Sequence, residues 1–209
     1  MKGYYQDLVT DKSWKILQAL KKNLNFILIG GWAVYLYSKN LKSKDIDIII
    51  DYQELDELKN DYQLIKNQRL KKYEIKKEGI DIDIYLPYFS DLGLPVEKLI
   101  KYADRNQSFR VLNKEVLLFT KLKAYQEREM TIKGVKDKID IISLVLLPDF
   151  DFVFWRNFIN KEKVSFYNEL VGKILLETKE VAALNLNQHV FAKKKKKLLE
   201  QVRSFQMTR

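Results

Sequence analysis

A short apolar run that ends in two adjacent glycines is the strongest constraint on how this chain folds. Residues 26–29 are Phe-Ile-Leu-Ile, and Gly30 and Gly31 follow directly. Four apolar residues closed by glycines are typical of a short buried strand. The segment 32–39 is predicted to be a helix that starts at the glycine pair. Because glycine has no side chain, the backbone N–H groups of this turn and the positive end of the helix can closely approach a phosphate group.

The next apolar segment carries two aspartates at alternate positions. Residues 45–50 are β-branched and continuous, which predicts a strand. Alternate residues of a strand project from the same face, so we expect Asp45 and Asp47 about 6–7 Å apart at Cα. Two aligned carboxylates are unfavourable unless a cation lies between them, and Mg²⁺ prefers such hard oxygen ligands. The pair is therefore a candidate magnesium site, and the alternative is a solvated pair on an edge strand.

A hairpin further along the chain adds another acidic strand. Residues 72–77 and 80–86 flank the turn Lys-Glu-Gly, and the second arm alternates strictly. Alternation puts Asp81 and Asp83 on one face of this arm. Either aspartate can supply a third carboxylate, which completes a site for two metal ions about 3.5–4 Å apart. Either one can instead simply face water.

The composition limits the chemistry that this chain can use. It has no cysteine, which removes disulfides, thiolate zinc sites, iron–sulfur clusters and cysteine nucleophiles. The single histidine, His189, makes Ser–His–Asp triads and His-rich metal sites hard to build. Hydrophobic residues make up 46% of the chain, which is enough for a buried core. Any catalysis is expected to use carboxylates, lysines and backbone amides.

The sequence pattern changes along the chain from alternating strands and helices to helices alone. We expect a mixed α/β module at residues 1–108 and a helical module at residues 109–209, which together give an α+β protein. Further helices are predicted over residues 11–22, 53–60, 113–124, 135–147, 150–158, 161–178 and 190–206. The last of these would carry a narrow apolar stripe that includes Phe205.

The C-terminal segment is strongly basic. Residues 193–209 contain seven basic residues and one acidic residue, so they carry +6 of the net charge of +10. A basic tail indicates a polyanionic partner, most simply RNA or DNA, and the alternative is a solvated helix face. No apolar run reaches the roughly 20 residues that a bilayer span needs, and the N-terminus does not resemble a signal peptide. We therefore expect a cytoplasmic protein with no membrane partner.

The motifs resemble a known family. Gly30-Gly31, then Asp45-Ile46-Asp47, then a later aspartate in an apolar strand resemble the nucleotidyltransferase fold of the DNA polymerase beta superfamily. Among the minimal nucleotidyltransferases, the AbiEii-type abortive-infection toxins are most similar to this chain in two segments, Gly-Gly-Trp-Ala-Val-Tyr-Leu and Ser-Lys-Asp-Ile-Asp. Residues 121–124 and 136–141 resemble that family's Lys-Leu-x-Ala and Lys-Asp-x-x-Asp-Ile helices. The resemblance covers about residues 26–147.

The resemblance implies a nucleotidyltransferase-like mixed sheet with flanking helices and an active site that holds two Mg²⁺ ions. Asp45 and Asp47 would hold both ions, and Asp83 would be the third ligand and the base that takes the acceptor's proton. Asp83 is preferred over Asp81 because Ile-Asp-Ile-Tyr-Leu is the more typical context of the family's third aspartate.

The resemblance also implies nucleotide contacts. Gly30-Gly31 would bind the phosphates of a nucleoside triphosphate (NTP), ATP included, with Ser43 as a hydroxyl donor nearby. Lys121 would counter the charge of the triphosphate, and Asp137 or Asp140 would position the lysine and the acceptor. Alternatively, Lys121 is one more exposed lysine, and the two aspartates only pair with neighbouring lysines on the helix surface.

Two classes of function follow. The first is an enzyme that transfers a nucleotide from an NTP to a hydroxyl of RNA, such as the tRNA 3′ end, of a protein or of a small molecule. By family analogy it would be the toxin of a toxin–antitoxin pair with a cognate antitoxin. The second is a non-catalytic module that keeps the fold and binds nucleic acid or a partner protein by charge. The enzyme needs carboxylates and Mg²⁺, whereas the module would show steep salt dependence.

Overall fold

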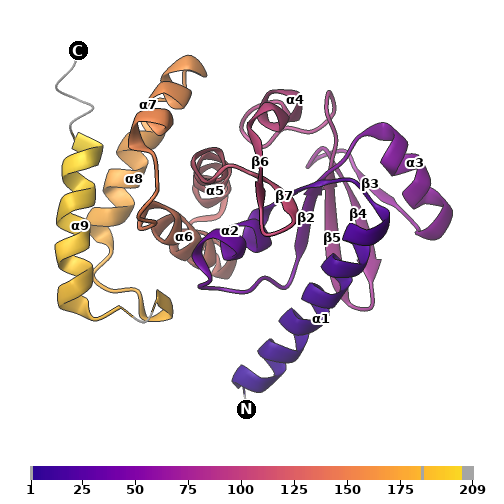
Figure 1. Cartoon of the computed structure of the whole chain (residues 1–209), viewed down its shortest axis with the longest axis horizontal. Helices are drawn as coiled ribbons and strands as arrows, with labels where there is room; N and C mark the ends of the chain where they lie inside the picture. Colours follow the sequence, from indigo (N-terminus) through magenta and orange to yellow (C-terminus); the bar gives the residue numbers. More distant parts are fainter. Residues whose placement is uncertain (1, 185, 204–209) are drawn as a thin grey trace. The chain divides into compact units, whose positions relative to one another are not determined.

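The computed structural model describes residues 2–184 and 186–203 of the chain. The chain divides into two compact units, Met1–Asn113 and Lys114–Arg209. The first unit contains a mixed sheet with helices, and the described residues of the second unit form helices and no strand (Figure 1). The expected α+β class, a mixed sheet with flanking helices followed by C-terminal helices, is confirmed.

The first unit is built on a seven-stranded sheet. Its strands are β1 (Ile27–Ile29), β2 (Ile46–Ile49), β3 (Ile65–Asn67), β4 (Lys72–Lys77), β5 (Ile80–Tyr85), β6 (Ala103–Asn106) and β7 (Phe109–Leu112). They lie in the order β3-β4-β5-β2-β1-β7-β6. Strand β2 is antiparallel to β1 and parallel to β5, and β1 is parallel to β7. The remaining neighbours are antiparallel.

Helices connect the strands and make up the second unit. The first unit has α1 (Lys2–Asn23), α2 (Gly30–Ser38), α3 (Tyr52–Asp61), α4 (Val96–Leu99) and the 3₁₀ turn η1 (Ile100–Tyr102). The second has α5 (Lys114–Arg128), α6 (Ile132–Val145), α7 (Phe152–Lys161), α8 (Phe166–Glu177), the 3₁₀ turn η2 (Ala182–Leu184) and α9 (Gln188–Arg203). Among the described residues, no helix combines the length and the apolar character that crossing a bilayer requires.

The sequence predicts most of these elements but not all of their ends. The strand predicted at 45–50 is shorter, because Lys44 and Asp45 form a bend before β2. The sequence does not predict β3, β6 and β7, which are only three or four residues long. The module boundary expected after residue 108 falls just before β7, which pairs with β1 and lies in the first unit.

Buried isoleucines alternate with half-buried aspartates along the neighbouring strands β2 and β5. These isoleucines are at most 1% exposed: Ile46, Ile48, Ile82 and Ile84. Since successive side chains of a strand point to opposite faces, the aspartates Asp47 and Asp83 lie on the face opposite to these isoleucines. The apolar face fixes the register, because a slip by one residue would bury the carboxylates.

Candidate active site

Two of the predicted carboxylates lie side by side on neighbouring strands of the sheet. Strands β2 and β5 are parallel, and their register pairs Asp47 with Asp83. Neighbouring strands lie about 4.8 Å apart, so the two carboxylates project side by side from one face. Asp81 lies two residues earlier on β5, opposite Lys76 of β4. The register therefore makes Asp83, and not Asp81, the neighbour of Asp47.

The Asp47 carboxylate lies directly against the glycine that begins α2. Ile29, the last residue of β1, is the register partner of Asp47, and Gly30 follows it with φ +65°. A Cβ atom on Gly30 would overlap the Asp47 carboxylate, because it would lie only 2.5 Å from Cγ of Asp47. Gly30 is thus required both by its left-handed backbone and by the neighbouring carboxylate. The carboxylate lies at the N-terminal end of a helix, where negative charge is favoured.

Lys72 forms an ion pair with the second carboxylate, that of Asp83. Its Nζ lies 2.6 Å from Oδ2 of Asp83 and 3.1 Å from Oε1 of Glu74, and its side chain is only 12% exposed. Glu74 in turn accepts a hydrogen bond of 3.0 Å from Nδ2 of Asn67. The result is a partly buried group of charges on β4 and β5.

The protonation of Asp83 reflects these surroundings. Burial and the negative charge of Asp47 raise its pKa to about 6, although Lys72 acts in the opposite direction. Burial lowers the pKa of Lys72, but the hydrogen bonds and charges of Asp83 and Glu74 outweigh this effect, so that pKa is raised. At neutral pH Asp83 is mostly ionised, yet it can accept a proton readily.

The other predicted residues near this pair are less tightly grouped. Asp45 is half-buried in the bend before β2, so strand alternation does not place it beside Asp47 as expected. Ser43 is 3% exposed, and Gly31 is buried in the first turn of α2. Within the described part of the chain, no three His, Cys, Asp or Glu side chains are grouped closely enough to hold a metal ion.

The pair Asp47 and Asp83 nevertheless fits one divalent cation. Mg²⁺ usually takes only one or two protein carboxylates and completes its coordination with phosphate oxygens and water. Two carboxylates side by side, one of them with its pKa raised by burial and by the charge of the other, form a donor set that a cation would stabilise. Lys72 already supplies one positive charge on the Asp83 side. A cation at the pair would share Asp83 with this lysine or displace it.

A second charged group lies inside the helical unit. Lys121 of α5 contacts Asp137 at 3.2 Å and Asp140 at 2.7 Å, both from α6. These three residues are only 7%, 1% and 1% exposed. Asp137 also accepts a hydrogen bond of 2.7 Å from Nε of Arg128. The alternative that the lysine and the two aspartates are surface residues is therefore wrong, and both aspartates hold the lysine.

Sequence reasoning missed Lys72 and Arg128, although a signal for each is present. Lys72 is two residues from Glu74, the register partner of Asp83, so the predicted hairpin brings Lys72 diagonally to Asp83. Arg128 follows Lys121 by two helical turns and therefore lies on the same face of α5. In each case the periodicity of the predicted element identifies the neighbour.

Two solved structures resemble this chain in outline. One is JHP933 from Helicobacter pylori, with a TM-score of 0.48 and 15% identity over 95% of this chain and 92% of that one. The other is an antigenic nucleotidyltransferase-like protein from Paracoccidioides brasiliensis, with a TM-score of 0.40 and 15% identity over 89% and 97%. No family model matches the sequence, and a search of curated proteins found no match.

Proposed function

We propose that this protein is a magnesium-dependent nucleotidyltransferase that moves a nucleoside monophosphate from an NTP to a hydroxyl acceptor. The observation that carries the proposal is the register pairing of Asp47 with Asp83, beside the glycine that begins α2. This arrangement combines a carboxylate pair for a cation with a helix N-terminus that favours phosphate.

In this proposal Asp47 and Asp83 would hold Mg²⁺, with Asp45 close by in the chain as a further ligand. Magnesium, when bound there, would stabilise the charge of the triphosphate and of the pyrophosphate leaving group. The acceptor oxygen attacks the α-phosphorus, the bond from that phosphorus to the pyrophosphate oxygen breaks, and pyrophosphate leaves. Asp83, which lies beside Asp47 on the neighbouring strand, would take the proton of the acceptor hydroxyl.

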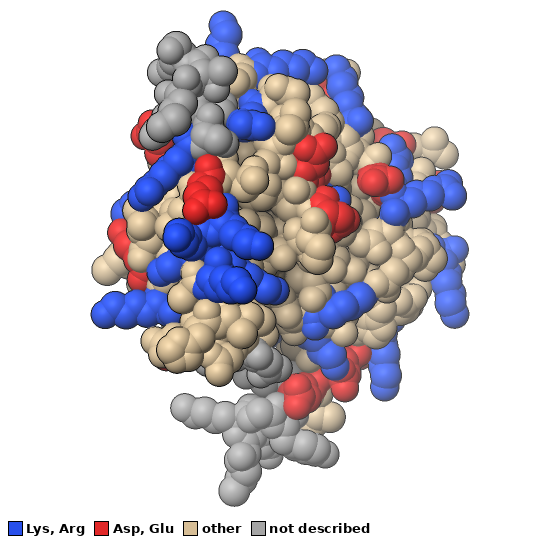
Figure 2. Space-filling model, turned by 60° about the vertical axis from the view of Figure 1, so that its left-hand side comes forward, with Lys and Arg blue, Asp and Glu red and all other residues tan. Residues whose placement is uncertain are grey.

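The basic helix α9 supports a polyanionic acceptor. Four of its lysines are exposed: Lys193, Lys194, Lys196 and Lys197. Figure 2, in which the side that carries α9 comes forward, shows Lys and Arg side chains gathered there in one group. Leu198 and Val202 are buried, so the helix separates an apolar from a basic face. Residues 204–209 of the expected tail, Phe205 included, lie outside the described residues.

We therefore propose RNA, such as a tRNA 3′ end, as the acceptor in preference to a protein or a small molecule. A role as the toxin of a toxin–antitoxin pair, with ATP among the possible nucleotides and an antitoxin as partner, is part of the same proposal. It rests on the motif resemblance alone.

One observation favours the second candidate function, a non-catalytic binding module. Lys72 lies 2.6 Å from Asp83 and compensates its charge without any metal. In such a module the carboxylates would only stabilise the sheet, and binding to a polyanion would depend on salt rather than on Mg²⁺.

Transfer of label from an α-labelled NTP distinguishes the two functions. The protein is incubated with Mg²⁺, each NTP in turn and total RNA, and the products are separated into RNA and protein. Asp47→Asn removes one ligand charge with little change in shape, and Asp56→Asn removes an exposed carboxylate on α3 as the control. We expect label on RNA with the wild type and Asp56→Asn and none with Asp47→Asn. Equal labelling by Asp47→Asn, or no labelling and no Mg–NTP binding by the wild type, contradicts the enzyme.

A further inference from the structure

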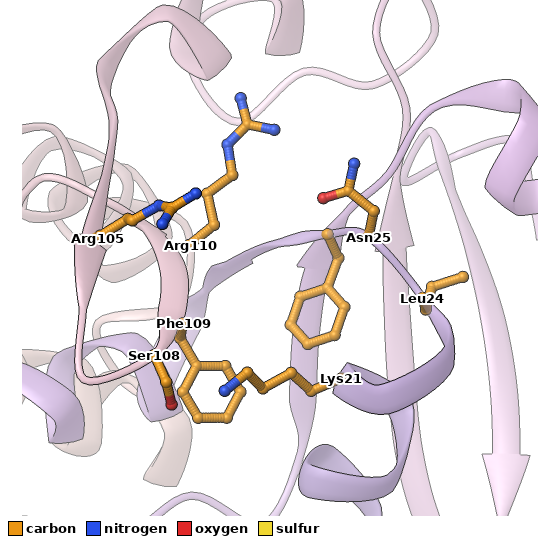
Figure 3. A pocket seen from close by; sticks show the side chains of 8 residues that line it. Lys21, Leu24, Asn25, Arg105, Ser108, Phe109 and Arg110 are labelled. Atoms are coloured by element: carbon orange, nitrogen blue, oxygen red, sulfur yellow. The ribbon is translucent and has the colours of Figure 1, made fainter.

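A basic cavity lies in the first unit, at the other end of β1 from Gly30. Its volume is about 310 Å³, and it lies between the end of α1 and the β6–β7 hairpin. Three cations line it: Lys21, Arg105 and Arg110. The rings of Phe26 and Phe109 also line it. Figure 3 shows the two arginines on one side of the cavity and Lys21 on the other.

The two arginines are placed so that they repel each other. Arg105 and Arg110 are direct register partners in the antiparallel β6–β7 hairpin, and both are exposed. Like charges directly opposite each other destabilise a strand pair. Asp104 accepts a hydrogen bond from the backbone N–H of Arg105. In the described part of the chain, however, no carboxylate forms a salt bridge within 4.0 Å of Arg105, Arg110 or Lys21.

The hairpin that carries the arginines is fixed to the rest of the first unit. Its turn residues Gln107 and Ser108 both have left-handed backbones, with φ 52° and 75°, as a tight two-residue hairpin turn requires. The side-chain amide of Gln107 donates to the carbonyl oxygen of Leu36 in α2 at 3.2 Å. The arginines are therefore presented by an anchored turn and not by a free loop.

The third cation is also held. Nζ of Lys21 lies 4.6 Å from the centroid of the Phe109 ring, which is a favourable cation–π distance. Phe109 itself is only 3% exposed, so the ring cannot move away easily. Three positive charges thus line one cavity before any ligand arrives.

We propose that this cavity binds the phosphate group of an organic phosphate, at a site separate from that of the proposed transfer reaction. An arginine guanidinium matches phosphate oxygens with two parallel hydrogen bonds, and a phosphate between Arg105 and Arg110 would remove their repulsion. The volume is at the lower end for small-molecule sites, and the phenylalanine rings add apolar wall. A free nucleotide and the terminal phosphate of a nucleic-acid strand offer this same chemistry.

The experiment uses the full chain in EDTA, so that no metal-dependent nucleotide binding at Asp47 contributes. The probes are AMP, adenosine, and an RNA tetranucleotide with either a 5′-phosphate or a 5′-hydroxyl. Binding is followed by the ¹H–¹⁵N spectra of the protein, arginine side chains included. Arg110→Gln is compared with Arg69→Gln, which removes an exposed arginine from a turn outside the cavity.

We expect AMP or the 5′-phosphorylated strand to shift the signals of Lys21 and residues 105–110, and the phosphate-free probes to leave them unchanged. Arg110→Gln should weaken binding about tenfold or more, whereas Arg69→Gln and Asp47→Asn should not. Without ligand, Arg110→Gln should unfold at the same or a higher temperature, because a repulsion is lost. A response to AMP identifies a free nucleotide as the source of the bound phosphate group. A response to the 5′-phosphorylated strand alone identifies the end of a nucleic-acid strand. The proposal is overturned by equal shifts with phosphate-free probes, by unchanged affinity in Arg110→Gln, or by no shift at millimolar probe.

Discussion

The protonation of Asp83 offers the sharpest quantitative test of the carboxylate pair. Its pKa of about 6 is raised mainly by burial and next by the charge of Asp47 on the adjacent strand. Replacing Asp47 by asparagine removes that charge and keeps the shape of the side chain. Two unit charges roughly 5–6 Å apart repel by about 3 kcal/mol at an effective dielectric constant of about 20. In Asp47→Asn the pKa of Asp83 should therefore fall by at most about two units. Burial should keep this pKa above the ordinary value of an aspartate.

The same pKa predicts how stability depends on pH. A carboxyl group whose pKa is raised in the folded state stabilises the fold most below its unfolded pKa, and this contribution is lost as the pH rises through the folded value. For Asp83, a shift from 3.8 to about 6 corresponds to a loss of up to about 3 kcal/mol between pH 4 and pH 6. Asp47→Asn should reduce this loss. Lys72→Met should raise the pKa of Asp83 further, because it removes the ion pair of 2.6 Å.

Carbon-13 NMR titration of the aspartate carboxyl groups measures this pKa directly, with Asp83→Asn to assign the signal. Asp56→Asn, on the exposed surface of α3, is the control and should leave the Asp83 signal unchanged. A wild-type pKa near 4 for Asp83 refutes the reasoning. So does a pKa that does not respond to Asp47→Asn, because the two carboxylates would then not be neighbours.

Three further predictions concern the glycine turn, the buried lysine and the basic helix. Gly30→Ala should lower the free energy of unfolding in urea by clearly more than Gly79→Ala. Both glycines have a positive φ, which costs an alanine roughly 1–2 kcal/mol. Only at Gly30 would the new Cβ atom also overlap a carboxylate, that of Asp47. Lys121→Met should lower the free energy of unfolding by about 3–5 kcal/mol, because two buried carboxylates lose this lysine and only Asp137 keeps a second cation, Arg128. At the half-buried Lys123, which pairs with the exposed Glu127, Lys123→Met should cost less than about 1 kcal/mol, and equal costs would refute the burial argument. Glutamine in place of the lysines of 193–197 should weaken RNA binding and flatten its salt dependence, with NTP binding unchanged; an unchanged salt slope would contradict RNA contact by α9.

Local patterns in the sequence predict the acidic strands well. Alternation of isoleucine and aspartate identifies the face of Asp47 and Asp83, because the period of a strand is two residues. It does not identify their pairing, since the order β5-β2-β1 depends on contacts between distant segments. The position of Asp45 was harder to predict, because a bend replaces the first residue of the expected strand.

The basic cavity shows where sequence patterns are insufficient. Strands β6 and β7 are four residues each, and their turn uses Gln107 and Ser108 instead of the Asn-Gly pair that usually marks such a hairpin. Because the sequence does not predict this hairpin, it also does not predict that Arg105 pairs with Arg110. The buried ion pairs of Lys121 were hidden for a related reason, because a charged residue on a helix is usually exposed.

Paramagnetic broadening by Mn²⁺, used in place of Mg²⁺, tests the central claim most directly. The protein is labelled with ¹⁵N, and Mn²⁺ is added at well below one equivalent. We predict that the amide signals of Gly30, Gly31, Asp47 and Asp83 broaden first, that Mg²⁺ reverses the effect, and that Asp47→Asn loses it. Broadening that begins elsewhere, or that is identical in Asp47→Asn, would contradict a cation site between these two carboxylates.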